Sequence, residues 1–523
     1  MLLAELVTAH DQVRATRSRR DKVAVLAALL RRLPAHERAL GARYLAGAPR
    51  QQRLGVRRAG VRRALVAPAA QPSLTLTEVD AALEAIAAEQ GPGSQSARHA
   101  RLADLLGRAT AAEQELLVAL LLGELRQGAQ TGLVTQALAE AAEADEAQVR
   151  RALMLQGDLG TVAEVALGGG RAALAAVGLA VGRPVQPMLA TSAGSVGEAL
   201  ADLGTALVEH KLDGARIQAH RDGGSVRVFT RSLREVTDAV PGVVRAVAAL
   251  PASALVLDGE AVGLAPDGSP EPFQRTMRRF GAAPEPDAEV DAADVAATAG
   301  ADVPLVPRFF DVLHRDGEDL LDAPLAQRRA ALGELVPEDE RIPGAVCDDV
   351  AQAEAIAAQA QAAGHEGVMV KDLAAPYRAG RRGQQWRKVK PVHTLDLLVV
   401  AVEWGSGRRR GWLSNLHLAA RDPTSGEPVM LGKTFKGLTD ALLAWQTERF
   451  LALEVAREGH VVRVRPEQVV EVAVDGVQDS PRYPAGLALR FARVVRYRPD
   501  KPPEQADTLE AVRALHPDAR GRG

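Results

Sequence analysis

The first 185 residues carry the spacing of hydrophobic positions that is typical of successive amphipathic helices. The apolar run Val23–Leu30 lies between basic flanks, and leucines recur at helical intervals from Leu116 to Leu121. The segment Gly182–Pro187 ends this pattern with two prolines, which cannot continue a helix. The pattern therefore predicts an all-α domain over residues 1–185.

Short apolar or alternating runs, which are typical of strands, begin after this segment and alternate with helical patches. The strand-like runs are Ser225–Phe229, Ala254–Leu257, Val306–Phe310 and Gly367–Val370, and the helical patches are Leu325–Leu335 and Ala351–Ala363. This alternation predicts an α+β domain over residues 186–391. Residues 282–302 are mostly Ala, Asp, Glu and Pro without periodicity, which predicts a flexible surface insertion.

Strand-like runs dominate after Lys390-Pro391. They are Leu395–Val402, Leu416–Ala420, Val429–Gly432 and Val469–Val474. Several short strands separated by turn residues predict an all-β domain over residues 392–510, of the size of an OB-fold barrel. An immunoglobulin-like sandwich fits the pattern nearly as well. Residues 511–523 are expected to form a C-terminal tail that frays from Pro517 onward.

Composition limits the class of protein. A chain of 523 residues is too long for one hydrophobic core, so several domains are expected. The single cysteine, Cys347, excludes a disulfide framework and a cysteine-based zinc site, which favours a reducing, cytoplasmic compartment. No window approaches the ~18 apolar residues of a membrane span, and no signal-peptide pattern is recognisable, so we expect no membrane association.

Charge is informative only where it is concentrated, because the formal net charge is −2. The first seventy residues are strongly basic, through Arg14, Arg17, Arg19, Arg20, Lys22, Arg31, Arg32, Arg38, Arg53, Arg57, Arg58, Arg62 and Arg63. Such a run is either a solvated face or a surface that contacts phosphates. Further on, two glycines flank Arg126 in Gly123–Ala129, which allows either close approach of the backbone to a partner or a plain turn between helices.

Lys211 is the residue with the clearest chemical environment in the sequence. Apolar residues lead into Glu209-His210-Lys211, and Asp213-Gly214 then forms a turn signal that ends the predicted strand. Alternation along a strand places Glu209 and Lys211 on one face, so Lys211 would lie at a strand end facing a cleft. This pattern fits a covalent nucleophile beside a phosphate, and equally a solvated lysine in a hairpin.

Other predicted strand ends carry groups that a nucleotide requires. Asp258-Gly259-Glu260 offers carboxylates for a ribose or a metal, or is an ordinary acidic turn; Phe309-Phe310-Asp311 offers a ring for a purine, or a core pair. The remaining groups are Arg231 after Phe229, Glu366 and Lys371 around a buried strand, Arg382, and Lys388 and Lys390, which alternation sends to one side. A nucleophilic lysine must lose a proton, and the nearby lysines together with Mg²⁺ would lower its pKa.

In this order and spacing, E-x-K-x-D-G-x-R, D-G-E, F-F-D, E-G-V-M-V-K and W-x-K-x-K resemble motifs I, III, IIIa, IV and V of the ATP-dependent DNA ligases. Arg490-Phe491-Ala492-Arg493 with Arg498–Lys501 resembles motif VI, although Ala492 stands where the family often has proline. The basic helical N-terminus and G-E-L-R-Q-G resemble the family's DNA-binding domain. The resemblance covers nearly the whole chain and implies a multidomain protein with DNA-binding, adenylation (nucleotidyltransferase) and OB-fold domains.

The resemblance implies an enzyme that seals nicks in double-stranded DNA through lysyl-AMP on Lys211 and an adenylated 5′-phosphate, with ATP as substrate and Mg²⁺ as cofactor. It implies that Glu209 and Phe310 contact the adenine end, and that Arg216 and Arg231 contact ribose or phosphate. Glu260 would bind the ribose or a metal, and Glu366 a metal. The residues implied to contact the phosphates are Arg382, Lys388 and Lys390, and those implied to orient the pyrophosphate are Arg490, Arg493, Asp500 and Lys501. Phe310 is preferred to Phe309 because it directly precedes Asp311. The basic N-terminal domain is expected to act after adenylation.

Two alternatives remain beside the nick-sealing enzyme. An RNA ligase or another covalent nucleotidyltransferase would share the lysine and several later motifs, but as a rule lacks the long helical N-terminal domain. A non-catalytic DNA-binding protein would lack Lys211, Glu366 or Lys388, and all three are present. An NAD-dependent ligase would carry a cysteine zinc module, which one cysteine cannot make. We expect a monomer that associates with the nucleoid.

Overall fold

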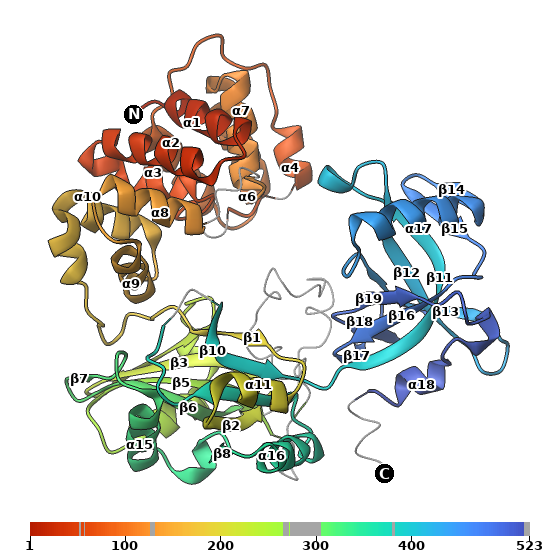
Figure 1. Cartoon of the computed structure of the whole chain (residues 1–523). Helices are drawn as coiled ribbons and strands as arrows, with labels where there is room; N and C mark the ends of the chain where they lie inside the picture. Colours follow the sequence, from red (N-terminus) through yellow and green to blue (C-terminus); the bar gives the residue numbers. More distant parts are fainter. Residues whose placement is uncertain are drawn as a thin grey trace.

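The computed structural model describes residues 1–51, 54–56, 58–125, 131–264, 271, 305–378 and 382–516, without the side chain of Arg382. Three parts follow one another along the chain: an N-terminal group of helices, a central part with two sheets, and a C-terminal part rich in strands (Figure 1). None of the described helices has the length and apolar character needed to cross a membrane.

The N-terminal part is helical, as the hydrophobic spacing predicts. Its helices are α1 Leu3–Ala15, α2 Arg19–Arg32, α3 Arg38–Leu45, α4 Arg58–Arg63, α5 Leu76–Ala88, α6 Ser94–Arg108, α7 Ala111–Leu121, α8 Thr131–Ala141, α9 Glu146–Gln156 and α10 Leu159–Ala175. Local sequence fixes the starts of α5 and α7. The Thr75 and Thr110 side chains each accept a hydrogen bond from the backbone N–H three residues on, and the Glu78 and Glu113 carboxylates accept from the backbone N–H of these threonines. The apolar faces of the helices in this part share one aliphatic core.

The central part contains two five-stranded sheets, with orders β1-β10-β9-β2-β8 and β4-β3-β5-β6-β7. The strands are β1 Leu189–Ser192, β2 Ala206–Lys211, β3 Ala215–Asp222, β4 Ser225–Thr230, β5 Ala254–Gly263, β6 Leu305–Arg315, β7 Glu318–Asp319, β8 Gly344–Cys347, β9 Gly367–Asp372 and β10 Arg382–Val389. The helices within the described residues of this part are α11 Val196–Leu203, α12 Pro241–Ala249, α15 Leu325–Leu335 and α16 Val350–Ala362.

Each sheet has one face covered by helices. Helices α11 and α16 share a core with β2 and β9, and α12 and α15 share another with β3 to β6. The opposite faces meet, because Val256 and Leu313 of one sheet pack in a cluster with Trp386 of the other. Polar groups that alternate onto these inner faces are therefore brought together between the two sheets.

Two predicted strand ends are wrong. Asp258-Gly259-Glu260 lies inside β5, which continues to Gly263, and Phe309-Phe310-Asp311 lies inside β6, which continues to Arg315. Gly259 is accommodated in mid-strand by a register shift in the pairing of β5 with β6. As a result Asp258, Glu260 and Phe310 come from the middle of a sheet, which holds them more rigidly than a turn would.

The C-terminal part contains a seven-stranded sheet and a separate two-stranded sheet formed by the strands β17 and β18. Its strands are β11 His393–Trp404, β12 Leu413–Arg421, β13 Pro428–Thr434, β14 Glu454–Glu458, β15 Val461–Val464, β16 Val469–Val474, β17 Gly476–Asp479, β18 Leu487–Arg490 and β19 Arg493–Tyr497. The long strand β11 pairs with β12 along one edge and with both β15 and β16 along the other. The strand-rich pattern after Lys390 is confirmed.

The C-terminal part also contains two helices that the strand pattern did not predict, α17 Asp440–Ala452 and α18 Leu509–Arg513. Phe450 of α17 and both Leu509 and Val512 of α18 are buried in the core of the sheet. Ordered structure therefore continues beyond residue 510, where the tail was expected to begin. The predicted insertion 282–302, the fraying end Pro517–Gly523, Arg53, Arg57 and residues 126–129 of the Gly123–Ala129 segment lie outside the described residues.

Candidate active site

Lys211 is the last residue of β2 and lies opposite Gly367, the first residue of β9. Gly367 has φ +145°, and a Cβ there would lie 2.2 Å from the carbonyl oxygen of Val389, so only glycine fits. This close approach brings the end of β10 to the start of β9. The backbone N–H of Glu366 also donates to the Lys211 carbonyl at 2.9 Å. Lys211, Glu366 and Lys390 thus meet at one strand edge.

The Glu366 carboxylate forms ion pairs with both Lys211 and Lys390. Burial alone would raise the pKa of Glu366, but the two ammonium groups hold it near 2, so the group is a carboxylate. Burial alone would lower the pKa of Lys211, but Glu366, Glu260 and Asp213 raise it above its ordinary value. Without ATP and Mg²⁺ the Lys211 pKa is therefore raised, because Glu366 pairs with Lys211 as well as with Lys390. The predicted lowering of the Lys211 pKa concerns the state loaded with ATP and Mg²⁺ and stays a prediction.

Glu260 approaches Lys211 from the second sheet. It lies opposite Arg216 in the pairing of β5 with β3, and both side chains alternate onto the inner face. Burial raises the pKa of Glu260 to about 7, although Lys211 and Arg216 act in the opposite direction. A carboxyl group in this state gains strongly from an added cation.

Arg216 is held by a buried polar network. Its guanidinium donates to the Asp258 carboxylate at 3.1 and 2.7 Å and to the Met188 carbonyl at 2.7 Å. The Tyr377 hydroxyl donates to Asp258 at 2.6 Å and accepts from the Met188 backbone N–H at 3.0 Å. Charge-assisted bonds of this kind fix the position of an arginine head group. Tyr377 was missed by sequence reasoning because a lone tyrosine in a loop carries no periodic signal.

Phe310 contributes the aromatic face predicted for the site. It lies on the inner face of β6, whereas Phe309 is fully buried against the helix-covered side. The Lys371 ammonium lies 4.3 Å from the ring centroids of both Phe310 and Trp386, and it forms a buried ion pair with Glu209. Burial raises the pKa of Glu209 despite this pair. Glu209 and Phe310 are thus linked through Lys371.

The C-terminal part reaches the same region. Arg490, the last residue of β18, donates to the Asp213 carboxylate at 2.8 Å, and Asp475 lies 3.3 Å from the Lys390 ammonium. Asp213 follows Lys211 by two residues in the turn between β2 and β3. The strand edge with Lys211 is therefore bridged to the C-terminal part by two ion pairs.

The structure brings together most, but not all, of the predicted site residues. Lys388 lies in β10 two residues after Trp386 and so shares its inner face. Arg231 lies in an exposed turn after β4, Arg493 is exposed at the start of β19, and the described interactions link neither to the Lys211 group. Asp500 pairs with Arg498, and Lys501 with Asp396, inside the C-terminal part. Arg382 is also a predicted site residue, but its side chain is not among the parts of the chain that the structure describes.

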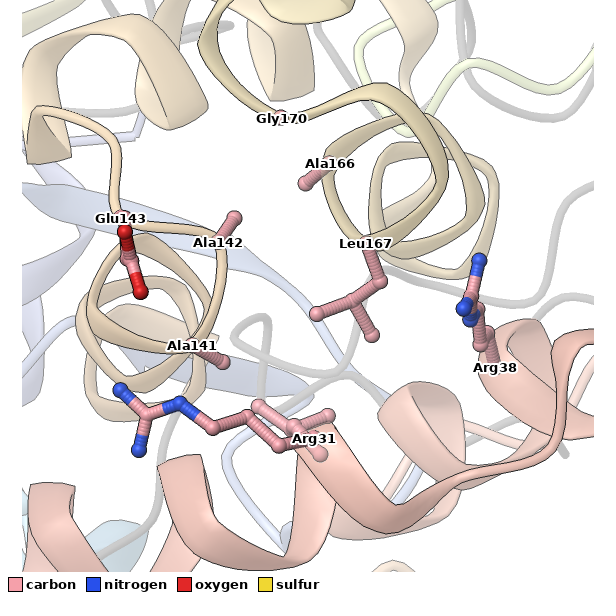
Figure 2. Close-up of a pocket in the computed structure, with 9 residues that line it drawn as sticks. Arg31, Arg38, Ala141, Ala142, Glu143, Ala166, Leu167 and Gly170 are labelled. Carbon is pink, nitrogen blue, oxygen red and sulfur yellow. The ribbon is translucent and has the colours of Figure 1, made fainter.

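A separate hollow of about 250 Å³ lies in the N-terminal part, between α2, α8 and α10. Arg31 and Arg38 lie on opposite sides of it, with Glu143 near a third edge and apolar residues between them (Figure 2). The Arg31 guanidinium donates to the Glu140 carbonyl at 2.6 Å. The hollow offers neither a nucleophile nor an aromatic ring, so it does not compete with the Lys211 region as a nucleotide site.

The two-sheet central part, with a strand-end lysine among carboxylates, a second lysine and an aromatic face, defines the class of nucleotidyltransferases. Three family descriptions match the chain: "DNA ligase N terminus" over residues 60–139, "ATP dependent DNA ligase domain" over 187–390 and "ATP dependent DNA ligase C terminal region" over 409–501. The chain belongs to the ATP-dependent DNA ligase family. It is accordingly an enzyme of the ligase type, with ATP and DNA as substrates.

Similar proteins support this membership along the whole chain. A protein named "Probable DNA ligase" from Anaeromyxobacter sp. (strain Fw109-5) is 57% identical over 519 residues, covering 99% of this chain and 98% of that one. A second with that name, from Nocardia farcinica (strain IFM 10152), is 55% identical over 526 residues, covering 99% and 100%. A solved structure titled "Pmar-Lig_PreS3", 17% identical with a TM-score of 0.61, covers 94% and 99% and supports the overall fold.

Proposed function

We propose that this enzyme seals nicks in duplex DNA in three steps, with Lys211 as the nucleophile of the first. The observation that carries the proposal is the position of Lys211, at a strand end beside Glu366, Lys390 and Glu260 and near the inner face that holds Phe310. In the first step the Lys211 Nζ releases a proton and attacks the α-phosphorus of ATP. A P–N bond forms, the bond to the β-phosphate oxygen breaks, and pyrophosphate leaves.

The two later steps transfer the AMP group. The 5′-phosphate at the nick attacks the lysyl-AMP phosphorus, which frees Lys211 and gives an adenylated 5′-phosphate. The 3′-hydroxyl then attacks that 5′-phosphate and releases AMP, so a phosphodiester bond joins the strand. Cations placed around the phosphates, such as Lys390 and Lys388, would stabilise the charge that moves in each step. The ion pair of Lys390 with Glu366 must rearrange for Lys390 to do this.

Mg²⁺ is the proposed cofactor, with Glu366 and Glu260 as its protein ligands. The described residues form no cluster of three or more His, Cys, Asp or Glu side chains that could hold a metal alone. Mg²⁺ commonly takes one or two carboxylates together with substrate phosphates, and two carboxyl groups beside Lys211 fit that set. A cation there would also favour the charged form of Glu260, whose pKa lies near 7. When bound, Mg²⁺ would supply charge neutralisation on phosphate oxygens.

The adenine end is assigned to the Phe310 ring, with Glu209 and Lys371 behind it. Phe310→Ala is expected to raise the ATP concentration for half-maximal lysyl-AMP formation about tenfold, because stacking of a base on an aromatic ring contributes roughly 1–3 kcal/mol. Titration of ATP against lysyl-AMP formation without DNA measures this.

Phe309→Ala is the matched control for the adenine assignment. Phe309 is fully buried on the opposite face of β6, so its loss should destabilise the fold by about 3–5 kcal/mol and change the ATP requirement of the folded protein less than twofold. Equal ATP requirements in the two variants would contradict the assignment of adenine to Phe310.

We propose domains over residues 1–185, 186–391 and from 392 onward, with an OB fold in the last. We move the start of the tail from 511 to after α18, because Leu509 and Val512 of this helix are buried in the core. The pairing of the long strand β11 with strands on both edges supports the barrel assignment. The short connection between β10 and β11, at Lys390–Val392, supports a hinge there. The proposal includes a monomer that associates with the nucleoid.

We assign the main contact with DNA to the basic N-terminal helices. Arg32 and Arg58 pair with Glu5 and Glu124, which reduces the free positive charge that the sequence suggested. Exposed arginines remain on α1, α2, α4 and the loop before α2: Arg14, Arg17, Arg20, Arg62 and Arg63. These would contact phosphates, so binding should be independent of sequence and weaken with added salt.

We propose that the ion pair between Arg490 and Asp213 holds the C-terminal domain closed over ATP. Arg490→Ala should slow lysyl-AMP formation about tenfold, since a charge-assisted hydrogen bond contributes about 1.5–3 kcal/mol and this pair is partly solvated. Asp213→Asn should cause a similar loss, and the double variant should be no slower than the slower single one.

Arg496→Ala is the control for the closure pair, because Arg496 makes an exposed ion pair with Glu471 in the same domain. Its rate of lysyl-AMP formation should stay within twofold of the wild type. Additive losses in the Arg490 and Asp213 variants would show that the two residues do not act as a pair.

The function is tested by sealing of a singly nicked DNA duplex with ATP and Mg²⁺. We expect sealing with ATP, and none when NAD replaces it. Sealing of a nicked RNA duplex in preference to DNA would identify an RNA ligase instead. Binding of nicked DNA without any covalent adenylate would identify a non-catalytic DNA-binding protein.

A further inference from the structure

Helix α9 packs against the side chains that support the nucleotide site, although it belongs to the N-terminal helical part. Met154 and Leu155 of α9 are buried in one cluster with Met188, Tyr377 and Trp386 of the central part. Leu155 is fully buried and Met154 is 4% exposed. In the view of Figure 1, α9 is at the lower end of the helical part, toward the central sheets. The cluster therefore crosses the boundary between the two parts of the chain.

The polypeptide that joins the two parts is itself bonded into this region. The backbone N–H of Gln186 donates to the Met154 carbonyl at 2.9 Å, which ties the connection to α9. The buried Gln218 side chain of β3 accepts from the Val185 N–H at 2.7 Å and donates to the Val185 carbonyl at 3.1 Å. The connection is thus fixed on both sides and does not behave as a free linker.

Contacts continue from this junction to the residues proposed to hold ATP. Met188 accepts from Arg216 and donates to Tyr377, and both of these bond to Asp258. The Trp386 ring packs edge-on against Tyr377 and against Phe310, with centroids 6.0 Å apart in each case. One buried cluster therefore connects α9 with the ring assigned to adenine.

We propose that α9 is a positioning element of the nucleotide site, so that the helical domain contributes to lysyl-AMP formation before DNA is bound. In this role Leu155 and Met154 hold Trp386 and Tyr377, which in turn hold Phe310 and Arg216. The proposal rests on the assignment of adenylation to Lys211 and the adenine to Phe310. It differs from the expectation that the N-terminal domain acts only after adenylation.

The same helix supplies a matched control. Leu153 is buried in the core of the helical part, on the other side of α9 from Leu155, because successive helical positions two apart differ by about 200°. Leu153→Ala and Leu155→Ala remove the same atoms from the same helix. Only the second removes atoms from the cluster that contains Tyr377 and Trp386.

The test measures lysyl-AMP formation by the full-length variants over a range of ATP concentrations, with Mg²⁺ and without DNA. Leu155→Ala should raise the half-saturating ATP concentration at least fivefold and change the maximal rate less than twofold. Leu153→Ala should change neither more than twofold, and Leu155→Met, which restores volume, should return the ATP requirement to within twofold of the wild type. Equal ATP requirements for Leu155→Ala and Leu153→Ala would overturn the proposal.

A surface variant covers the case in which Leu155→Ala does not fold. Arg151 of α9 forms two hydrogen bonds with Asp322 of the central part, at 2.8 and 2.7 Å. Arg151→Asp should raise the half-saturating ATP concentration about threefold by repulsion, and adding Asp322→Arg should reverse this; no change in Arg151→Asp would equally overturn the proposal. If the wild type forms no lysyl-AMP, the proposed function fails, whereas normal labelling of all variants rejects only the role of α9.

Discussion

Lys211→Arg is expected to lower the rate of lysyl-AMP formation on the order of 10⁴-fold or more. Arginine keeps the positive charge and can still pair with Glu366, so the local electrostatics change little. A guanidinium does not lose its proton in proteins and is therefore no nucleophile. The loss would thus report the chemistry of the amine and not the stability of the site. The measurement is transfer of label from α-labelled ATP to protein, with Mg²⁺ and without DNA.

Lys433→Arg is the matched control for Lys211→Arg. Lys433 also pairs with a glutamate, Glu403, but in the C-terminal part. This variant should form lysyl-AMP within twofold of the wild type. Lys211→Arg should still seal a nick whose 5′-phosphate is already adenylated, within about tenfold of the wild type, because that step forms no bond to Lys211. Label on Lys211→Arg protein would show that another residue is the nucleophile.

Glu366→Gln is expected to slow lysyl-AMP formation about 10²–10³-fold at saturating ATP and Mg²⁺, because it removes a proposed metal ligand and a charge that organises two lysines. The same change removes the largest carboxylate influence that raises the Lys211 pKa. The variant should therefore have a lower maximal rate and a pH profile displaced to lower pH.

The pH dependence has a definite sign in the wild type. The Lys211 pKa lies above its ordinary value, so the fraction of free amine rises about tenfold per pH unit across pH 7–9. Where chemistry limits the rate, lysyl-AMP formation should rise with pH in the same proportion. In Glu366→Gln this rise should level off at a lower pH. Single-turnover rates at a series of pH values test both statements.

Glu403→Gln is the control for Glu366→Gln. Glu403 likewise has a pKa near 2, held down against burial by its partners Lys433 and His417, but it lies in the C-terminal part. Its substitution should change the rate less than threefold and leave the pH profile in place. An unchanged profile in Glu366→Gln would mean that Glu366 does not control the protonation of Lys211.

The sequence predicted the local surroundings of Lys211 well because they depend on neighbours in the chain. An apolar run, then Lys211, then Asp213-Gly214 specify a strand and a turn, and β2 and β3 follow that pattern. The helix predicted over Leu325–Leu335 has the same bounds in the structure, where Leu332 and Leu335 pack in the core of the sheet. These features need only hydrophobic period and turn chemistry.

The sequence predictions failed where the structure depends on strand pairing and on side-chain partners that are distant in the chain. Glycine in D-G-E suggested a strand end, but pairing on both sides carries β5 through Gly259. Local spacing also gave no sign that two lysines of the site are paired with acids, Lys371 with Glu209 and Lys390 with Glu366. Helix α17 was missed because it lies within a run of strands. Partners distant in the chain cannot be read from local spacing.

The arrangement of the site suggests how ATP would change it. Glu366 pairs with both Lys211 and Lys390, and Asp213 pairs with Arg490, so five charged groups of the site are paired with one another. Phosphates of ATP would compete for Lys211 and Lys390, and Mg²⁺ would compete for Glu366. Exchange of these partners, followed by loss of the Lys211 proton, is the central step of the account.

The most direct test is to identify the residue that receives AMP. The full-length protein is incubated with α-labelled ATP and Mg²⁺ without DNA, digested, and the labelled peptide is sequenced by mass spectrometry. The account predicts one acid-labile AMP adduct, on Lys211, which disappears when nicked duplex DNA is added and a sealed strand appears. An adduct on any other residue, or sealing of DNA with ATP while Lys211 carries no AMP at any time, would contradict it.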